Sequence, residues 1–526
     1  MSYRAPVDDI LSAMIHAGGL GRGITSGIYA DLGDGVAEAI LEEAGKFAAD
    51  RLAPLNKVGD RHGTPLKDGR VTMPPGWLEA YRDWAAAGWC SIVASPDFGG
   101  QGLPTLLNSA CTEIWNSANM GFSLNPLLTM GAVEALTAHG SDTLKETYLT
   151  RMIAGEWTGT MNLTEPGAGS DLAQIRTRAE RAGDGSYRIT GSKIFITYGE
   201  HDLTENILHL VLARLPDAPA GTRGISLFLV PKFLVNADGS LGARNDVRCH
   251  SIEHKMGIHA SPTCTMVFGD NGGAVGYLVG EENRGLACMF TMMNNARLNV
   301  GLQGVAIAER AYQQALAYAQ ERKQGKAIGS TAAGPEAIIA HPDVKRMLLD
   351  MRTKTAAARA LCYATAGALD RAERLTDPAA KKAAHEEASL LTPIAKAFST
   401  DIGIEVASTG VQIHGGMGFI EETGAAQHLR DARIAAIYEG TNGIQAIDLV
   451  TRKLPLADGE TVKDVIHACR TAADKAAAIN DPGFARIGRI LRDAVGSLER
   501  CTDFMMKALK AAPNDALAGA TPYLRL

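Results

Sequence analysis

The chain has 526 residues, of which 46% are hydrophobic and 21% charged, a composition typical of a globular protein of about three or four domains. The formal net charge of −6 gives no overall attraction to a phosphate polymer, so nucleic acid is not an expected partner. No window holds ~18 uninterrupted apolar residues and the N-terminus lacks the apolar core of a secretory signal, so neither a membrane span nor export is expected. The eight cysteines are scattered without a C-x-x-C pair, which indicates reduced thiols and a cytoplasmic location.

Hydrophobic periodicity divides the chain into four parts. Helical patterning from about residue 35 to 155 predicts an N-terminal helical domain (1–156), and a period of two, as in 194–197 and 225–230, predicts a β-barrel or sandwich domain (157–280). The helical period returns after Gly285 and predicts a four-helix bundle (281–455). A linker-like break precedes a helical extension (456–526). The expected fold class is therefore α+β, mostly α.

Two stretches in the second half of the chain, one charged and one amphipathic, allow predictions of local structure. The charged stretch 370–387 is interpreted as a solvated helix end and loop. The extension is expected to contain an amphipathic helix with one apolar stripe, formed by Ile487, Ile490, Leu491, Ala494, Val495 and Leu498.

Three segments occur in a fixed order: 164–171 (TEPGAGSD), 412–419 (QIHGGMGF) followed by RDAR at 430–433, and 438–445 (YEGTNGIQ). Through them, residues 1 to about 455 resemble the acyl-CoA dehydrogenase family. The resemblance implies an FAD enzyme that desaturates an acyl-CoA thioester to the trans-2-enoyl-CoA and passes electrons to an electron-transfer flavoprotein. It also implies a homodimer or a dimer of dimers.

Glu439 is the candidate base. Alone, a glutamate beside Gly440 at a loop-to-helix junction is typical of a helix-start charge. Removal of a proton next to a thioester needs a carboxylate with a raised pKa, and the largely apolar residues 434–438 offer such surroundings. The resemblance implies that Glu439 is catalytic and that its backbone N–H binds the thioester oxygen. Some relatives place the base before the arginine that matches Arg297, and here that residue is Ala296.

The resemblance also assigns cofactor and substrate residues. Two glycines in 164–171 let backbone approach a planar ring, and Phe195 stands where the family commonly has tryptophan, so it stacks without an indole N–H. Arg322 matches a family arginine, but Gly325 stands where the family has phenylalanine. An arginine at an ordinary charged helix end would be equally common. The implied flavin residues are Met161, Thr164, Ser170, Phe195 and Thr197, with Arg322, Gln412, Gly415 and Gly416 from the neighbouring subunit on the adenosine diphosphate half, and Thr441 and Asn442 in the same pocket. The implied substrate residues are Ser170, Arg297, Tyr438 and Gly440.

Several alternatives remain beside this interpretation. An acyl-CoA oxidase would share these motifs, and a DNA-binding alkylation-response flavoprotein shares the fold, although residues 456–526 hold ten Lys+Arg and nine Asp+Glu, too balanced to follow phosphates. The spacings of His250, His254, His259 and Cys264 fit no common metal site, and no dinucleotide or phosphate-loop motif is present. The extension resembles the long subclass that includes 3-methylmercaptopropionyl-CoA dehydrogenases, which makes that thioester, or another short or medium one, a candidate substrate. Members of that subclass usually continue past the stretch matching 520–526, so the chain is expected to be either short or cut.

Overall fold

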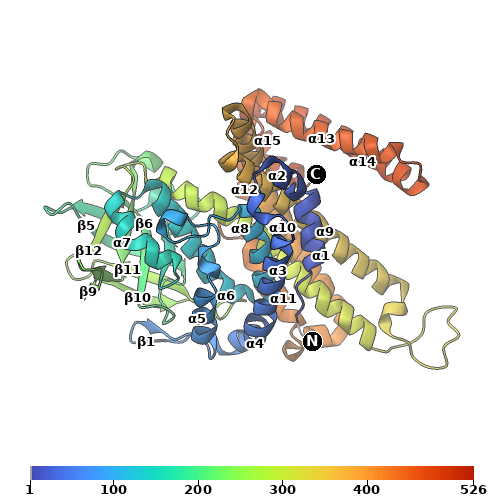
Figure 1. Cartoon of the computed structure of the whole chain (residues 1–526), viewed down its shortest axis with the longest axis horizontal. Coiled ribbons are helices and arrows are strands. Elements are labelled where there is room, and N and C mark those ends of the chain that lie inside the picture. The colour runs from blue at the N-terminus through green and yellow to red at the C-terminus, as the bar shows by residue number, and fades with distance from the viewer. Residues whose placement is uncertain (1–2) are drawn as a thin grey trace.

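Helices build the first part of the chain. The computed structural model describes residues 3–526 (Figure 1). The first elements are α1 (Val7–His16), α2 (Leu20–Ser26), α3 (Val36–Phe47), α4 (Ala53–His62), β1 (Leu66–Lys67), β2 (Arg70–Val71), α5 (Trp77–Ala86), α6 (Thr105–His139) and α7 (Asp142–Ile153). The long helix α6 is interrupted at Asn119, whose ψ of 92° is not helical, and Asn119 Oδ1 accepts the N–H of Phe122 where the helix restarts. Helical structure thus starts earlier than residue 35, where the sequence pattern begins.

The middle of the chain is a β-domain. Its strands are β3 (Trp157–Asn162), β4 (Arg178–Arg181), β5 (Tyr187–Thr197), β6 (Asn206–Arg214), β7 (Ile225–Pro231), β8 (Phe233–Val235), β9 (Leu241–Arg244), β10 (Val247–Ile252), β11 (Thr263–Phe268) and β12 (Ala274–Val279). The main sheet runs β10-β11-β5-β12-β7-β6-β3, and β4 pairs with both β5 and β6. Because β4 closes the path between β5 and β6, these strands form a ring, which is the barrel form of the expected domain.

A bundle of long helices follows the β-domain. It consists of α8 (Gly285–Glu321), α9 (Pro342–Arg374), α10 (Pro378–His414), α11 (Ala425–Ala432) and α12 (Asn442–Asp448). Helices α8, α9 and α10 pack on one another, and α8 and α9 also pack on α6. Gly304 lets α8 approach α10 closely, since a Cβ there would lie 2.2 Å from the carbonyl oxygen of Ser399. The helices of the N-terminal part, the β-domain and this bundle confirm the expected α+β, mostly α fold class.

The charged stretch 370–387 is only partly the solvated loop that the sequence indicated. The helix end and loop are present between Arg374 and Pro378. Asp370, however, is fully buried: its carboxylate accepts the N–H groups of Thr105 and Leu106 at 2.7 and 2.8 Å, at the start of α6. The sequence could not reveal this role, because the orphan N–H groups that attract the carboxylate lie 265 and 264 residues away.

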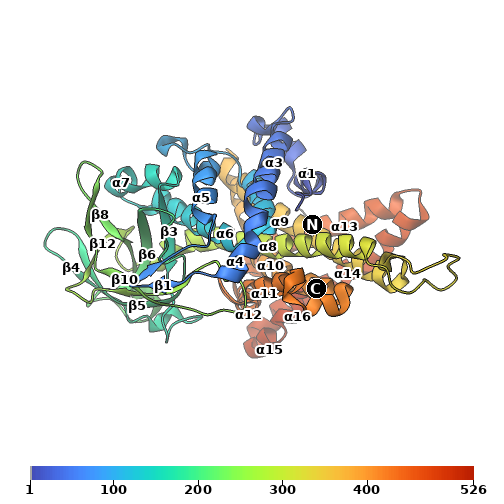
Figure 2. The ribbon, with the colours of Figure 1, turned by 90° about the horizontal axis from the view of Figure 1, so that it is seen from below.

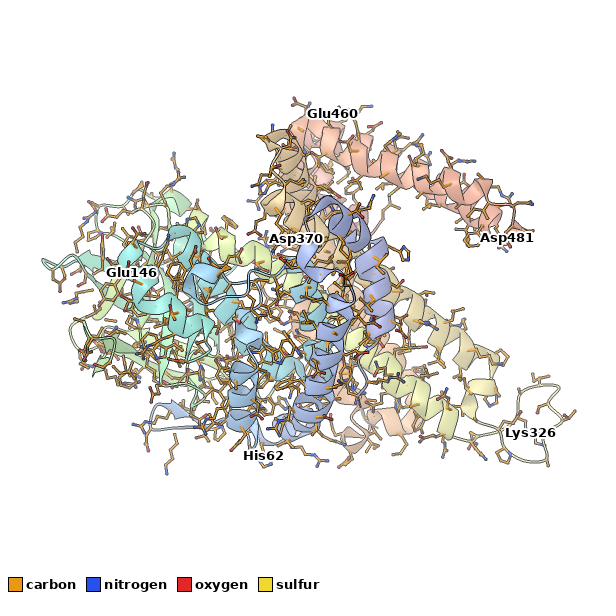
Figure 3. All side chains as sticks on the ribbon, viewed as in Figure 1. His62, Glu146, Lys326, Asp370, Glu460 and Asp481 are labelled. Atoms are coloured by element: carbon orange, nitrogen blue, oxygen red, sulfur yellow. The ribbon has the colours of Figure 1, made fainter. Side chains whose placement is uncertain are left out.

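The extension forms α13 (Glu460–Ala478), α14 (Pro482–Ala511), α15 (Pro513–Ala518) and α16 (Ala520–Arg525). Figure 3 shows α13 and α14 as a hairpin that projects from the body, with Glu460 at its base and Asp481 at its tip. The predicted apolar stripe of α14 is divided. Val495 is buried, whereas Ile487 and Ile490 are exposed, since this part of the hairpin extends beyond the bundle. None of the helices in residues 3–526 has the length and apolar character needed to cross a membrane.

A buried ion cluster joins α6, α8 and α9. Arg359 contacts Glu113 at 2.7 Å and Glu309 at 2.9 Å, and all three side chains are at most 7% exposed. Arg359→Met would leave two carboxylates buried without their cation, so we expect the free energy of unfolding to fall by about 3–5 kcal/mol. Denaturant unfolding followed by circular dichroism measures this. Arg346→Met, on the exposed face of α9, is the matched control, and a loss below about 1 kcal/mol for Arg359→Met would contradict the expectation.

Candidate active site

The loop that carries Glu439 has an unusual backbone. Glu439 and Gly440 both have left-handed φ values, 56° and 83°, and a non-glycine residue there is uncommon. The Gln445 side chain holds the turn, because its amide nitrogen donates to the carbonyl oxygens of Glu439 and Gly440 at 3.2 and 3.1 Å. Thr441 ends the loop as the N-cap of α12, since its hydroxyl accepts the N–H of Ile444 at 3.2 Å. Such strain is typical of functional sites.

The charges of two basic side chains, one on α8 and one on α10, act on Glu439. Burial raises the pKa of Glu439 to about 7, and the nearby charges of Arg297 on α8 and Lys396 on α10 oppose that rise. Arg297 is itself buried and paired with Asp448 at 3.3 Å. Burial lowers the pKa of Lys396 to about 7, against the charge of Glu439. The loop therefore holds a carboxylate that changes its charge near neutral pH, which suits a general base.

Tyr438 anchors the same loop to α8. Its hydroxyl donates to Oε1 of Gln303, which is fully buried. Within residues 3–526, no backbone or side-chain acceptor is found for the N–H of Glu439. That N–H is consequently free to donate to a bound oxygen, as the sequence interpretation requires.

A second group of predicted residues lies on the β-domain, around the loop after β3. Glu165 fixes this loop: its carboxylate accepts the N–H of Arg176 at 2.7 Å and the ammonium of Lys193 at 2.8 Å. Lys193 also donates to the carbonyl oxygen of Leu163 at 3.0 Å, and the carbonyl of Thr164 accepts the N–H of Ile194 at 2.9 Å. Thr164 is thus held between two anchored neighbours. Sequence reasoning missed Glu165 and Lys193, although Glu165 lies inside the quoted segment.

The surroundings of Thr164 fit a planar ring. Phe195, at the end of β5, is 58% exposed with a φ of 60°, which is rare for a large aromatic residue. Gly167 and Gly169 have open space where a Cβ would stand. An exposed aromatic face beside open backbone is the arrangement that the isoalloxazine ring of FAD needs. Of the remaining predicted residues here, Met161 and Thr197 are half-buried on β3 and β5, and Ser170 is exposed.

A third group lies where α8 and α10 end. Tyr318 on α8 stacks on His414 of α10, with ring centroids 4.4 Å apart, and so brings Arg322 close to the end of α10. Gln412 borders a surface hollow of ≈ 280 Å³ on α9 and α10. Gly415 and Gly416 are exposed, with open space around them, and could let a diphosphate approach the backbone.

The structure does not bring the second and third groups together in one chain. α8 leads from the β-domain to the far end of the bundle over ~55 Å. Figures 1 and 2 show the β-domain at one end of the molecule and the loop after α8 at the other, and Lys326 marks this loop in Figure 3. One FAD cannot reach both groups of the same chain. This separation fits the expectation that the adenosine diphosphate half is held by a neighbouring subunit.

The side chain of Asn442 faces inward. Its amide oxygen accepts the ammonium of Lys396 at 2.9 Å, and its amide nitrogen donates to Asp401 at 2.8 Å and to the hydroxyl of Thr400 at 3.0 Å. Since these contacts occupy the side chain, only the backbone of Asn442 is available to a cofactor. The assignments of the other site residues stay predictions.

Comparison with known proteins identifies the chain. Family models match three consecutive parts: the acyl-CoA dehydrogenase N-terminal domain at residues 36–156, the middle domain at 160–271 and the C-terminal domain at 283–454. A barrel between two helical domains, with these matches, defines an FAD-dependent oxidoreductase. The chain belongs to the acyl-CoA dehydrogenase family.

Relatives and solved structures agree with this assignment. A 3-methylmercaptopropionyl-CoA dehydrogenase of Ruegeria pomeroyi is 49% identical over 100% of this chain and 89% of its own length. A butyryl-CoA dehydrogenase of Syntrophomonas wolfei is 38% identical over 87% of this chain and 76% of its own. The structure of butyryl-CoA dehydrogenase from Megasphaera elsdenii superposes with a TM-score of 0.64 at 27% identity, over 78% of this chain and 96% of that one. Caenorhabditis elegans ACDH-11 in complex with C11-CoA shares the fold over 99% of this chain and 85% of its own, with a TM-score of 0.77 at 20% identity.

Proposed function

We propose that this chain oxidises an acyl-CoA thioester to the trans-2-enoyl-CoA, with Glu439 as the base that takes the α-proton. The observation that carries this proposal is the environment of Glu439, a recessed carboxylate in a left-handed turn whose pKa is raised to about 7. A base with a pKa near the working pH combines a large ionised fraction with a strong pull on the proton.

The residues around Glu439 orient the substrate and control charge. The N–H of Glu439 would donate to the thioester oxygen and so make the α-proton more acidic. A side chain at Gly440 is disfavoured by its φ of 83°, and its Cβ would displace Nε2 of Gln445, 2.8 Å away, which holds the turn. Arg297 is paired with Asp448, so we assign it to stabilising the carboxylate of Glu439 rather than to direct contact with the substrate. FAD, bound against Phe195 and Thr164, would supply the acceptor for the hydride that leaves the β-carbon.

For the substrate we propose 3-methylmercaptopropionyl-CoA or another short or medium acyl-CoA. The support is the relative of that name, which matches along this whole chain. We further propose a cytoplasmic homodimer, or dimer of dimers, that passes electrons to an electron-transfer flavoprotein. An oxidase is the alternative, and the two differ in whether the reduced enzyme consumes oxygen.

A panel of thioesters tests the activity and the substrate together. The FAD-loaded protein is mixed without oxygen with 3-methylmercaptopropionyl-CoA, butyryl-CoA or a long-chain acyl-CoA, and the flavin absorbance is followed. Rapid bleaching by the first supports the proposed substrate, and faster bleaching by another one reassigns it. If none bleaches the flavin, the proposed function is wrong.

The activity should depend on pH in one direction. Only the carboxylate form of Glu439 can accept the α-proton, and its pKa is about 7. The apparent second-order rate of flavin bleaching should therefore rise about tenfold per pH unit below 7 and level off above about 8. Anaerobic stopped-flow absorbance from about pH 5.5 to 9 measures this profile. A flat profile would show that another group sets the rate.

A further inference from the structure

The side chain of Lys396 is fully buried beside the proposed base. It projects from the middle of α10, and its surface exposure is 0%. A buried ammonium costs free energy unless partners compensate it. Its hydrogen-bond partner in residues 3–526 is Oδ1 of Asn442 at 2.9 Å. Among the charges that act on its pKa, that of Glu439 has the largest effect, followed by that of Asp401. The charges of Lys396 and Glu439 therefore act on each other.

Asn442 fixes the direction of this ammonium. Its amide group is held from three sides by α10, through Asp401 at 2.8 Å, the hydroxyl of Thr400 at 3.0 Å and the carbonyl of Ala397 at 3.2 Å. These contacts orient the amide so that its oxygen faces Lys396. Asn442 is also the first residue of α12, three positions after Glu439, so one residue links the ammonium to the loop that carries the base.

The C-terminal extension covers this arrangement from outside. Ala446 and Val450, which follow Asn442, are fully buried in one apolar cluster with Tyr523 and Leu524 of α16. Arg525 closes the edge: it pairs with Glu405 at 2.5 Å and approaches Asp401 at 4.0 Å. Helix α16 packs on α12 and α10, and Figure 2 shows it beside α12. Lys396 itself has no exposed surface, so its charge acts on Glu439 through a medium that screens weakly.

We infer that Lys396 is a positioning residue, held by Asn442, whose ammonium keeps the carboxylate form of Glu439 available for proton abstraction. This inference rests on the proposed function of Glu439. The other groups that face Glu439 are Arg297 from α8 and Tyr438 next to it in the loop, and Arg297 is partly neutralised by Asp448. Because the charges of Glu439 and Lys396 act on each other, the two groups are expected to titrate as a pair.

Lys396→Met tests the charge at nearly constant volume. Without the ammonium, we expect the midpoint of the pH profile for flavin bleaching to rise by about one unit or more. The rate should fall about fivefold at pH 7 and recover to near the wild-type value above about pH 9. Lys396→Arg keeps the charge and should keep the midpoint. A merely structural role would lower the rate at every pH, and an unchanged midpoint in Lys396→Met would overturn the inference.

Two further measurements keep the test decisive. If Lys396→Met does not fold, Asn442→Ala removes the acceptor instead, and its midpoint should rise in the same direction; an unchanged midpoint there overturns the inference. The infrared band of a protonated carboxyl, identified by its loss in Glu439→Gln, follows the titration of Glu439 without any substrate. If the pH midpoint at which this band appears rises in Lys396→Met while no thioester bleaches the flavin, the inference stands and the proposed function fails.

Discussion

Glu439→Gln should abolish turnover while leaving the protein folded and loaded with FAD. Glutamine keeps the shape of the side chain, so the left-handed turn and the hydrogen bonds of Gln445 to the loop carbonyls are retained. It cannot accept the α-proton. We expect flavin bleaching by the best thioester to slow by about 10³–10⁴-fold, which is about 4–5.5 kcal/mol of activation free energy.

Anaerobic stopped-flow absorbance measures this loss, together with the FAD content of the purified protein. Glu422→Gln, on the exposed turn before α11, is the matched control and should behave as wild type. The pH dependence below 7 should also disappear in Glu439→Gln. If the variant bleaches its flavin within tenfold of the wild-type rate, the base lies elsewhere.

The double variant Arg322→Ala with Gln412→Ala should lose FAD. Both residues are exposed at the far end of the bundle, where we propose that they hold the adenosine diphosphate half bound to a partner chain. Charge-assisted hydrogen bonds are worth about 1.5–3 kcal/mol each, so removal of both the guanidinium and the amide should weaken FAD binding by about 10²–10⁴-fold. Titration of the apo-protein with FAD, followed by flavin fluorescence, measures the change, and Arg486→Ala on α14 is the surface control.

Mixing this double variant with Glu439→Gln tests the sharing of FAD directly. Each protein alone is expected to be inactive. In a mixed dimer, one site combines the intact Glu439 of the double variant with the intact Arg322 and Gln412 of the other chain, so up to half of the sites in mixed dimers should regain activity. If the subunits exchange, as shown with two different affinity tags, and no activity returns, FAD is held within single chains.

The sequence determined the order of elements and the identity of the loops. The change of hydrophobic period near 157 and again after Gly285 predicted the β-domain and the long helices, because burial on one face imposes a period of two on strands and 3.6 on helices. The segments at 164–171 and 438–445 were located through their resemblance to the acyl-CoA dehydrogenase family, and their glycines permit close backbone approach and a left-handed turn.

Only the tertiary structure decided what surrounds these loops. The placement of Lys396 near the loop of Glu439 needs the packing of α12 on α10, and nothing in the local pattern distinguishes Lys396 from a lysine on a solvated face. Sequence reasoning also did not predict that Asp370 of α9 caps the start of α6, or that half of the α14 stripe is exposed. Local spacing indicates which face of a helix is apolar. The partner of a buried charge, or of an apolar face, depends on residues far away in the chain, so only the folded structure reveals it.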